Sequence, residues 1–278
     1  MAFVAKLFGA ALGAGAARLA FAAARHNPPG PEPKVWSRVN HRGEPVTLLE
    51  GPAYAAGAAA AIALAPGVPA ALRTAGVGAA VGAGAFGVYD DLRGNGDRRG
   101  MRGHLAALGK GELTTGGVKV VGIGAVGLVA GSLVRRGPGD GLAEKVLAGV
   151  VVAGAANAVN LFDLRPGRAI KVAALAAAPG LVRAGAPGTA VVRGAGLGAA
   201  LALLPEDLGE KAMLGDAGAN ALGAVLGTVA AANATRGGLL WRAAALTAVT
   251  LASEKVSFTR VIAKYAPLRA LDGFGRRA

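Results

Sequence analysis

Apolar stretches of about 20 residues recur along the whole chain and limit its fold more than any other feature. Nine such windows, rich in Ala, Gly, Val and Leu, lie near residues 2–24, 52–72, 74–89, 116–134, 142–161, 169–183, 188–204, 217–233 and 238–254. A helix of this length crosses the hydrocarbon core of a bilayer, whereas an open sheet would leave backbone groups unpaired in lipid. We therefore predict an all-α, polytopic membrane helix bundle with about nine transmembrane helices.

Composition indicates one integral membrane domain over residues 1–278, because 53% of the residues are hydrophobic and only 17% are charged. The formal net charge is +14, but the charges cluster between apolar windows, where they usually set membrane orientation. We expect no nucleic-acid partner. The chain has no cysteine, which excludes disulfides and zinc–thiolate sites. Lys6 and Arg18 lie inside the first window, so we expect a retained helix and not a cleaved signal peptide.

The loops between windows differ strongly in positive charge. The loops after the first, third, fifth and seventh windows, with the C-terminal tail, hold 20 lysines and arginines, and the opposite loops hold 8. The positive-inside rule then predicts an external N-terminus and a cytoplasmic C-terminus. We expect a multi-pass protein of the plasma membrane with a basic, amphipathic cytoplasmic tail over about residues 255–278.

Three stretches on the predicted cytoplasmic side end or begin an apolar window with an acid: "VYDDLRG" (88–94), "NAVNLFDLRPGR" (157–168) and "AMLGDAGANALG" (212–223). A carboxylate at the membrane border loses hydration, at a cost that a cation or hydrogen-bond donors can offset. Any one of these acids alone is explained as a solvated charge. Three on one face favour a Mg²⁺ site, since Mg²⁺ binds carboxylate oxygens and bridges to phosphates. A prenyl-synthase site is excluded because Gly94 stands where its third acid is needed.

In order and spacing these stretches resemble the signature segments of the polyprenyl-phosphate N-acetylhexosamine-1-phosphate transferases. "NHRGEP" (40–45) resembles the family's first cytoplasmic loop, "YDDLRG" its paired aspartates, "NAVNLFD" its Asn/Asp loop and "MLGDAGANALG" its GDxGS segment. The resemblance covers most of the chain. It implies Mg²⁺-dependent transfer of a sugar 1-phosphate from a nucleotide sugar, expected to be a UDP-sugar, to polyprenyl (undecaprenyl) phosphate for cell-envelope polymer synthesis, by a homodimer.

The resemblance also implies roles for single residues. Asp90, Asp91 and Asp163 are the expected catalytic residues, and Asp216 with Asp91 the expected ligands of Mg²⁺ or, in its place, Mn²⁺. The expected substrate-binding residues carry amide or cationic groups on the same side; they are Asn160, Arg165, Arg168, Arg93, Arg102, Lys110 and Lys119. For each cation alone, a role in membrane orientation is an equal alternative.

The chain departs from the family pattern in two loops. Leu164 and Pro166 replace a glycine and a second acid of the Asn/Asp loop, and residues 254–277 contain no histidine where relatives have a histidine-rich motif. A catalytically weakened paralogue that binds polyprenyl phosphate or scaffolds envelope enzymes is therefore the alternative. A transporter is disfavoured because the apolar windows lack midspan acids. The sequence identifies neither the sugar nor the lipid length.

Overall fold

The structure, a computed structural model, describes residues 2–30, 32–40, 42–94, 103, 107, 109–112, 114–135, 137–182 and 185–277. It is 77% helical, with eleven α-helices in that part of the chain. The predicted all-α bundle is confirmed. Arg102, one of the expected phosphate-binding residues, lies outside the described residues.

Each of the nine apolar windows forms a helix. The helices are α1 (Ala2–His26), α2 (Glu50–Leu64), α3 (Ala70–Arg93), α5 (Thr115–Val134), α6 (Leu142–Phe162), α7 (Arg168–Val182), α8 (Pro187–Leu208), α9 (Gly215–Ala232) and α10 (Arg236–Ser253). Five of them, α1, α3, α5, α6 and α8, are long and apolar enough to cross a membrane, judged on the described residues. The number of nine crossings remains a prediction.

The outer surface of the bundle is apolar. Leu19, Leu64, Leu142 and Val182 are 74%, 79%, 79% and 88% exposed. A protein surrounded by water rarely keeps so many large apolar side chains on its surface, whereas lipid tails solvate them at no cost. The exposed surface therefore agrees with the five membrane-spanning candidates.

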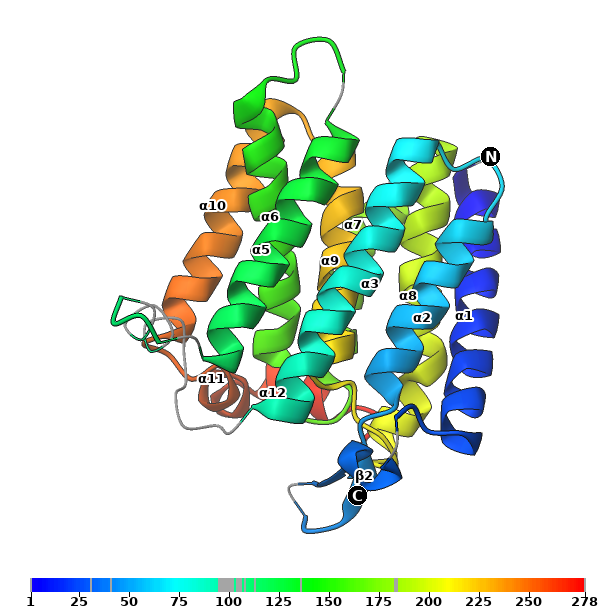
Figure 1. The fold of residues 1–278 in the computed structure, drawn as a ribbon, viewed down its shortest axis with the longest axis vertical. Helices are drawn as coiled ribbons and strands as arrows, with labels where there is room; N and C mark the ends of the chain where they lie inside the picture. The colour runs from blue at the N-terminus through cyan, green and yellow to red at the C-terminus, as the bar shows by residue number, and fades with distance from the viewer. Residues whose placement is uncertain are drawn as a thin grey trace.

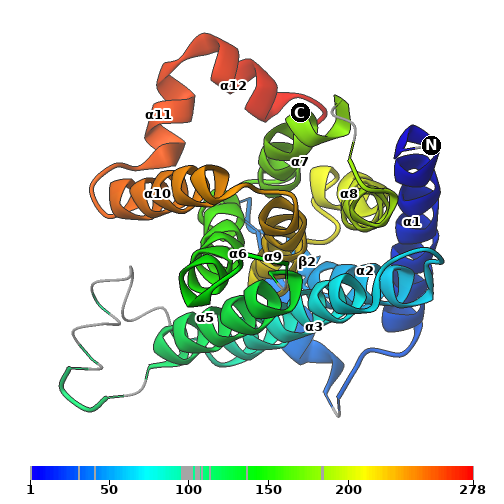
Figure 2. The same ribbon diagram turned by 90° about the horizontal axis from the view of Figure 1, so that it is seen from above.

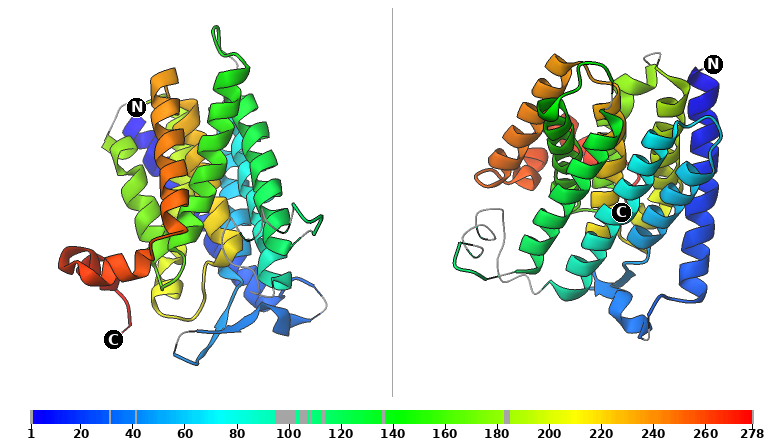
Figure 3. Two further views of the ribbon diagram at one scale, coloured as in Figure 1. Left: turned by 90° about the vertical axis from the view of Figure 1, so that its left-hand side faces the viewer. Right: turned by 45° about the horizontal axis from the view of Figure 1, so that its top comes forward.

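The connecting segments with most positive charge lie at one end of the bundle. This end carries a short 3₁₀ helix (Pro33–Trp36) and the antiparallel strands β1 (Ser37–Val39) and β2 (Pro45–Thr47), with Ser37 opposite Thr47. It also carries the C-terminal helices α11 (Phe258–Lys264) and α12 (Ala266–Gly273), while the N-terminus lies at the other end (Figure 1). The side view in Figure 3 shows the β-strands and the tail projecting from the same end of the bundle.

Helix α9 lies at the centre of the bundle, surrounded by α2, α3, α5, α6, α7 and α8 (Figure 2). Its residues are mostly Gly and Ala, and small side chains let neighbouring helix backbones approach closely. A Cβ added to Gly223 would lie 2.2 Å from the carbonyl oxygen of Ala155 in α6. Close packing therefore fixes α9, which carries Asp216 in its first turn, against its neighbours.

Helices α1 and α8 also pack backbone to backbone. A Cβ on Gly13 of α1 would lie 2.1 Å from the carbonyl oxygen of Ala195, and one on Gly198 of α8 would lie 2.1 Å from that of Ala10. Gly9 of α1 and Gly194 of α8 approach the partner backbone in the same way, so each helix contributes two glycines spaced by four residues. Van der Waals contact between small residues is the main attraction between helices in lipid.

Three details differ from the sequence prediction. The window at 52–72 is broken after Leu64, because Pro66 and Pro69 lack the N–H groups that a continuous helix needs. The basic tail, expected as one uninterrupted amphipathic segment, forms two short helices separated at Tyr265, with Pro267 in the first turn of α12. The β1–β2 pair was not predicted, since strands of three residues leave too short a pattern in the sequence.

Candidate functional site

The paired aspartates at the end of α3 point to different neighbours. Successive residues on a helix are rotated by about 100°. Asp90 contacts Lys119 of α5, and Asp91 contacts the first turn of α9. The two acids therefore occupy different environments although they are adjacent in sequence.

Asp91 caps the amino terminus of α9. Its carboxylate oxygens accept hydrogen bonds from the backbone N–H groups of Asp216 at 3.0 Å and Ala217 at 2.9 Å. The first N–H groups of a helix have no partner within the helix and carry partial positive charge, so a carboxylate satisfies them well. Arg38 donates to the carbonyl oxygen of Asp91 at 2.5 Å and ties this corner to β1.

Asp163, which follows α6 directly, binds the same helix end. It accepts a hydrogen bond from the backbone N–H of Gly215. Burial, and then the negative charges of Asp207, Asp216 and Asp91, raise the pKa of the Asp163 carboxyl well above its ordinary value. The first three N–H groups of α9 are thus held by two acids from two predicted motifs.

Gly215 makes this arrangement possible. It has a φ of +60°, which favours glycine, and its position is crowded. A Cβ there would lie 3.0 Å from Leu48 and 3.1 and 3.3 Å from the two carboxylate oxygens of Asp91. The glycine of the "GD" pair therefore allows Asp91 to reach the helix.

Asp90, Lys119 and Asp216 form one ion-pair cluster. The ammonium of Lys119 lies 2.7 Å from Asp90 Oδ2 and 2.5 Å from Asp216 Oδ2. The three side chains come from α3, α5 and α9 and are at most 24% exposed. The Lys119 ammonium therefore lies between the two acids and contacts an oxygen of each.

No group of three His, Cys, Asp or Glu side chains placed to hold a metal occurs in the described part of the chain. Two carboxylates nevertheless form a donor set that Mg²⁺ accepts, because it commonly takes its remaining ligands from waters and substrate phosphates. Asp90 and Asp216 would offer one oxygen each to such a set in place of the contacts that they make with Lys119. Asp91 has both oxygens engaged by the backbone of α9, which the sequence did not predict.

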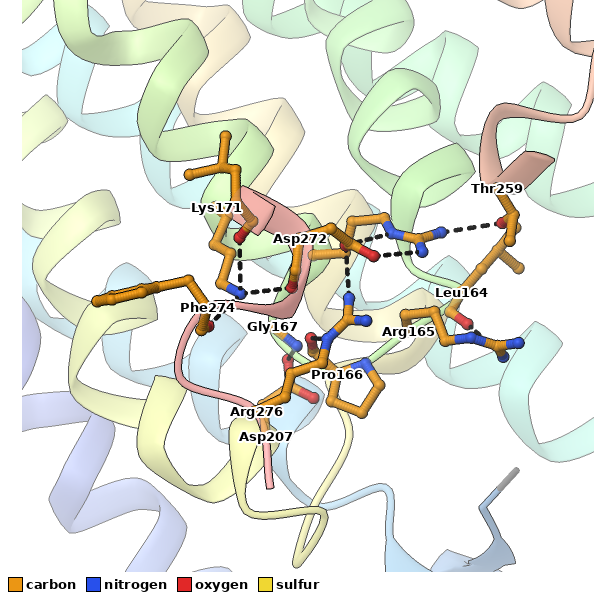
Figure 4. A network of polar contacts seen from close by, with 12 residues as sticks. Leu164, Arg165, Pro166, Gly167, Lys171, Asp207, Thr259, Asp272, Phe274 and Arg276 are labelled. Atoms are coloured by element: carbon orange, nitrogen blue, oxygen red, sulfur yellow. Dashed lines mark hydrogen bonds and ion pairs between the residues drawn. The ribbon is translucent and has the colours of Figure 1, made fainter. Parts of the chain in front are cut away.

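The loop after α6 is held by the C-terminal tail (Figure 4). Arg168, 4% exposed, makes paired hydrogen bonds of 2.8 and 2.9 Å to Asp272 and a third to Thr259. Arg276 donates to the carbonyl oxygen of Pro166 at 2.9 Å. On the other side of the loop, Asp207 accepts from Gly167 N–H at 3.0 Å. Arg168 is therefore engaged within the protein.

A cavity of 270 Å³ lies beside this loop. Asp163, Arg165, Asp207 and Glu210 provide its charged lining, and its apolar lining includes Val46 and Met213. Arg165 is exposed, and its guanidinium donates to the carbonyl oxygen of Leu164. Two of the expected substrate-binding or catalytic residues, Asp163 and Arg165, thus share one cavity.

The "NHRGEP" segment packs against the chain that leads into α9. Asn40 donates to Glu210 at 2.7 Å, and Arg42 pairs with Glu210 at 3.1 Å. The carbonyl oxygen of Thr47 accepts from Met213 N–H at 2.9 Å. Four stretches distant in sequence therefore meet at one end of the bundle.

The other expected residues lie around this end. Arg93 and Lys110 are exposed, and Asn160 is half-buried in the last turn of α6. Sequence reasoning missed Arg38 and Asp207, whose contacts with Asp91 and Gly167 join segments 53 and 40 residues apart. No short-range pattern indicates such pairs.

Neither a model of a known protein family nor a curated protein matches the chain.

Proposed function

We propose that the protein is a membrane glycosyl-1-phosphate transferase of the polyprenyl-phosphate N-acetylhexosamine-1-phosphate transferase type. It transfers a sugar 1-phosphate from a UDP-sugar to undecaprenyl phosphate at the cytoplasmic face of the plasma membrane. Four sequence stretches in the family's order support this assignment. The observation that carries it is the cluster in which Asp90, Lys119 and Asp216, from three helices, share contacts within 2.7 Å.

The chemistry needs few groups. A phosphate oxygen of the lipid attacks the phosphorus that bears the sugar, the new P–O bond forms, and the bond to the bridging oxygen breaks to release UMP. Such transfers depend chiefly on positioning and charge neutralisation. Asp90 and Asp216 would hold Mg²⁺, which would supply that neutralisation, with Lys119 as a further positive charge nearby.

Each remaining residue has a defined task in this proposal. Asp90 orients the acceptor phosphate and accepts its proton when it is protonated. Asp163 and Arg165 line the 270 Å³ cavity, which receives the nucleotide with Asn160 nearby in sequence. Arg93 and Lys110, both exposed, attract the phosphates. Asp91 and Gly215 act through α9 by holding Asp216 in place.

The proposal is tested by incubating the purified protein with undecaprenyl phosphate, Mg²⁺ and a panel of nucleotide sugars. We expect release of UMP from one donor, dependent on both the lipid and the metal. Chelation with EDTA should stop the release, and added Mg²⁺ or Mn²⁺ should restore it. Absence of nucleoside monophosphate with every donor contradicts the enzymatic assignment.

The alternative is a catalytically weakened paralogue that binds polyprenyl phosphate or scaffolds envelope enzymes. One observation favours it: Lys119 already offsets one of the two negative charges of Asp90 and Asp216, which reduces the need for a metal. In that case the protein should retain undecaprenyl phosphate through purification, and EDTA should not change its affinity for this lipid. None of the nucleotide sugars should be consumed.

A further inference from the structure

A second cavity, of 450 Å³, lies at the end of α1, and none of Asp90, Lys119 and Asp216 lines it. It is bounded by the last turns of α1, the 3₁₀ helix and the start of α2. Its floor is apolar: Phe21, Trp36 and Leu49 line it and are 4%, 6% and 5% exposed. The indole N–H of Trp36 donates to the carbonyl oxygen of Pro29, which fixes the ring in the floor.

The only ionisable residues among those lining this cavity are two cations, Arg25 and Lys211. Both are exposed, and Arg25 lies 5.8 Å from the ring centroid of Phe21. Within the described residues neither side chain pairs with a carboxylate. Three nearby arginines, in contrast, form ion pairs with acids: Arg18 with Glu206, Arg42 with Glu210 and Arg277 with Glu44.

The cavity lies where a membrane surface is expected. Helix α1 is a membrane-spanning candidate that ends at His26, one residue beyond Arg25. The helix lies at the edge of the bundle in Figure 2, and its side chains at Leu7 and Leu19 are 55% and 74% exposed. Lipid tails are therefore expected along the exposed face of α1, with the lipid headgroups at the level of its last turn.

We propose that this cavity binds the phosphate headgroup of an anionic membrane phospholipid, with its acyl chains along α1. Two cations without acidic partners match a single phosphate anion, and Ser37 and Thr47 add hydroxyl groups to the lining. A zwitterionic headgroup fits less well, because its own cation is repelled by Arg25 and Lys211. This lipid site is separate from the site proposed for undecaprenyl phosphate and does not depend on catalytic activity.

The proposal is tested by native mass spectrometry of the purified protein in micelles with equal amounts of phosphatidylglycerol and phosphatidylcholine of the same chain length. We expect the protein to retain phosphatidylglycerol preferentially. Each of Arg25→Gln and Lys211→Gln should lower the preference about fivefold, because one basic residue near an anionic surface contributes about that factor. Lys34→Gln is the matched control, since Lys34 is an exposed cation of the same segment outside the cavity lining.

Two results would overturn the proposal. The first is equal retention of both lipids by the wild-type protein, or a preference that survives in both cavity variants. The second is displacement of phosphatidylglycerol by millimolar inorganic phosphate, which would indicate a water-accessible anion site. Circular dichroism of each variant in phosphatidylcholine checks that it is folded, and the two cavity variants test the proposal independently of each other.

Discussion

Asp91 holds the helix that carries Asp216: its two carboxylate oxygens accept the backbone N–H groups of Asp216 at 3.0 Å and Ala217 at 2.9 Å. One of the paired aspartates thus positions the backbone, while its neighbour Asp90 reaches the Asp216 side chain through Lys119. Two adjacent acids at the end of a membrane helix have different structural tasks. This division of tasks leads to the first prediction.

We expect Asp91→Ala to lower the free energy of unfolding by about 3 kcal/mol, because two hydrogen bonds to a charged acceptor are lost and the N–H groups are left without a protein partner. Asp91→Asn should cost less, since its amide oxygen can still accept one bond. Denaturation in detergent followed by circular dichroism measures the change, and hydrogen exchange should be faster at the Asp216 and Ala217 amides. Unchanged stability and exchange in Asp91→Ala would contradict the capping role.

Gly215→Ala should destabilise the protein by about 1–2 kcal/mol, because an L side chain at positive φ is strained. Its Cβ would also crowd Leu48 and the Asp91 carboxylate at 3.0 to 3.3 Å. Gly124→Ala is the control: nothing lies within 4 Å of its added Cβ, and it sits inside helix α5. That control should be neutral or slightly stabilising. Equal effects of the two substitutions on the melting temperature would refute the argument.

We expect Arg165 to act in substrate binding and Arg168 in stability, although they are close in sequence. Arg165→Ala should raise KM for the nucleotide sugar more than it lowers kcat, because the side chain is exposed beside the proposed nucleotide cavity. Arg168→Ala should instead lower the melting temperature, because it leaves half-buried Asp272 without its paired hydrogen bonds. Steady-state kinetics and thermal denaturation of both variants separate the two roles. A reversed pattern would show that the assignment of the loop is wrong.

The helices could be predicted from the sequence because each one is a long apolar run. A continuous apolar run of about 20 residues predicts a helix. The predicted helix ends were less accurate. Helix α2 ends at Leu64, eight residues before the predicted boundary at 72, because prolines follow it. The β1–β2 strands are too short to leave a pattern, and their pairing depends on the turn between them.

The candidate site was predictable only in its residue types. The sequence located Asp90, Asp163 and Asp216 at helix ends, and the structure brings these ends together. Which oxygen binds which donor depends on the rotation and depth of α9, which only the packed bundle determines. The pairing of Arg168 with Asp272 joins residues 104 positions apart, so no local pattern could distinguish it from a substrate-binding arginine.

Orientation can be tested directly because the chain has no cysteine. We expect Lys110→Cys, at the basic end, to resist an impermeant thiol reagent added outside intact cells and to react after permeabilisation. Pro138→Cys, an exposed residue at the opposite end, should react in intact cells. Labelling of residue 110 from outside would reverse the topology and would place the acid cluster on the external face.

The central claim is that Asp216 acts with Asp90 in metal-dependent phosphoryl transfer. Its most direct test is the rate of Mg²⁺-dependent UMP release from the preferred donor in wild type, Asp216→Asn and Asp272→Asn. We predict that Asp216→Asn loses at least about 100-fold in rate while its melting temperature stays close to wild type, because the residue is proposed to hold the Mg²⁺ that neutralises charge in the transition state. Asp272→Asn, a tail acid outside the cluster, should lower the melting temperature through its pair with Arg168 but lose far less rate than Asp216→Asn. Near-wild-type turnover in Asp216→Asn would contradict the account.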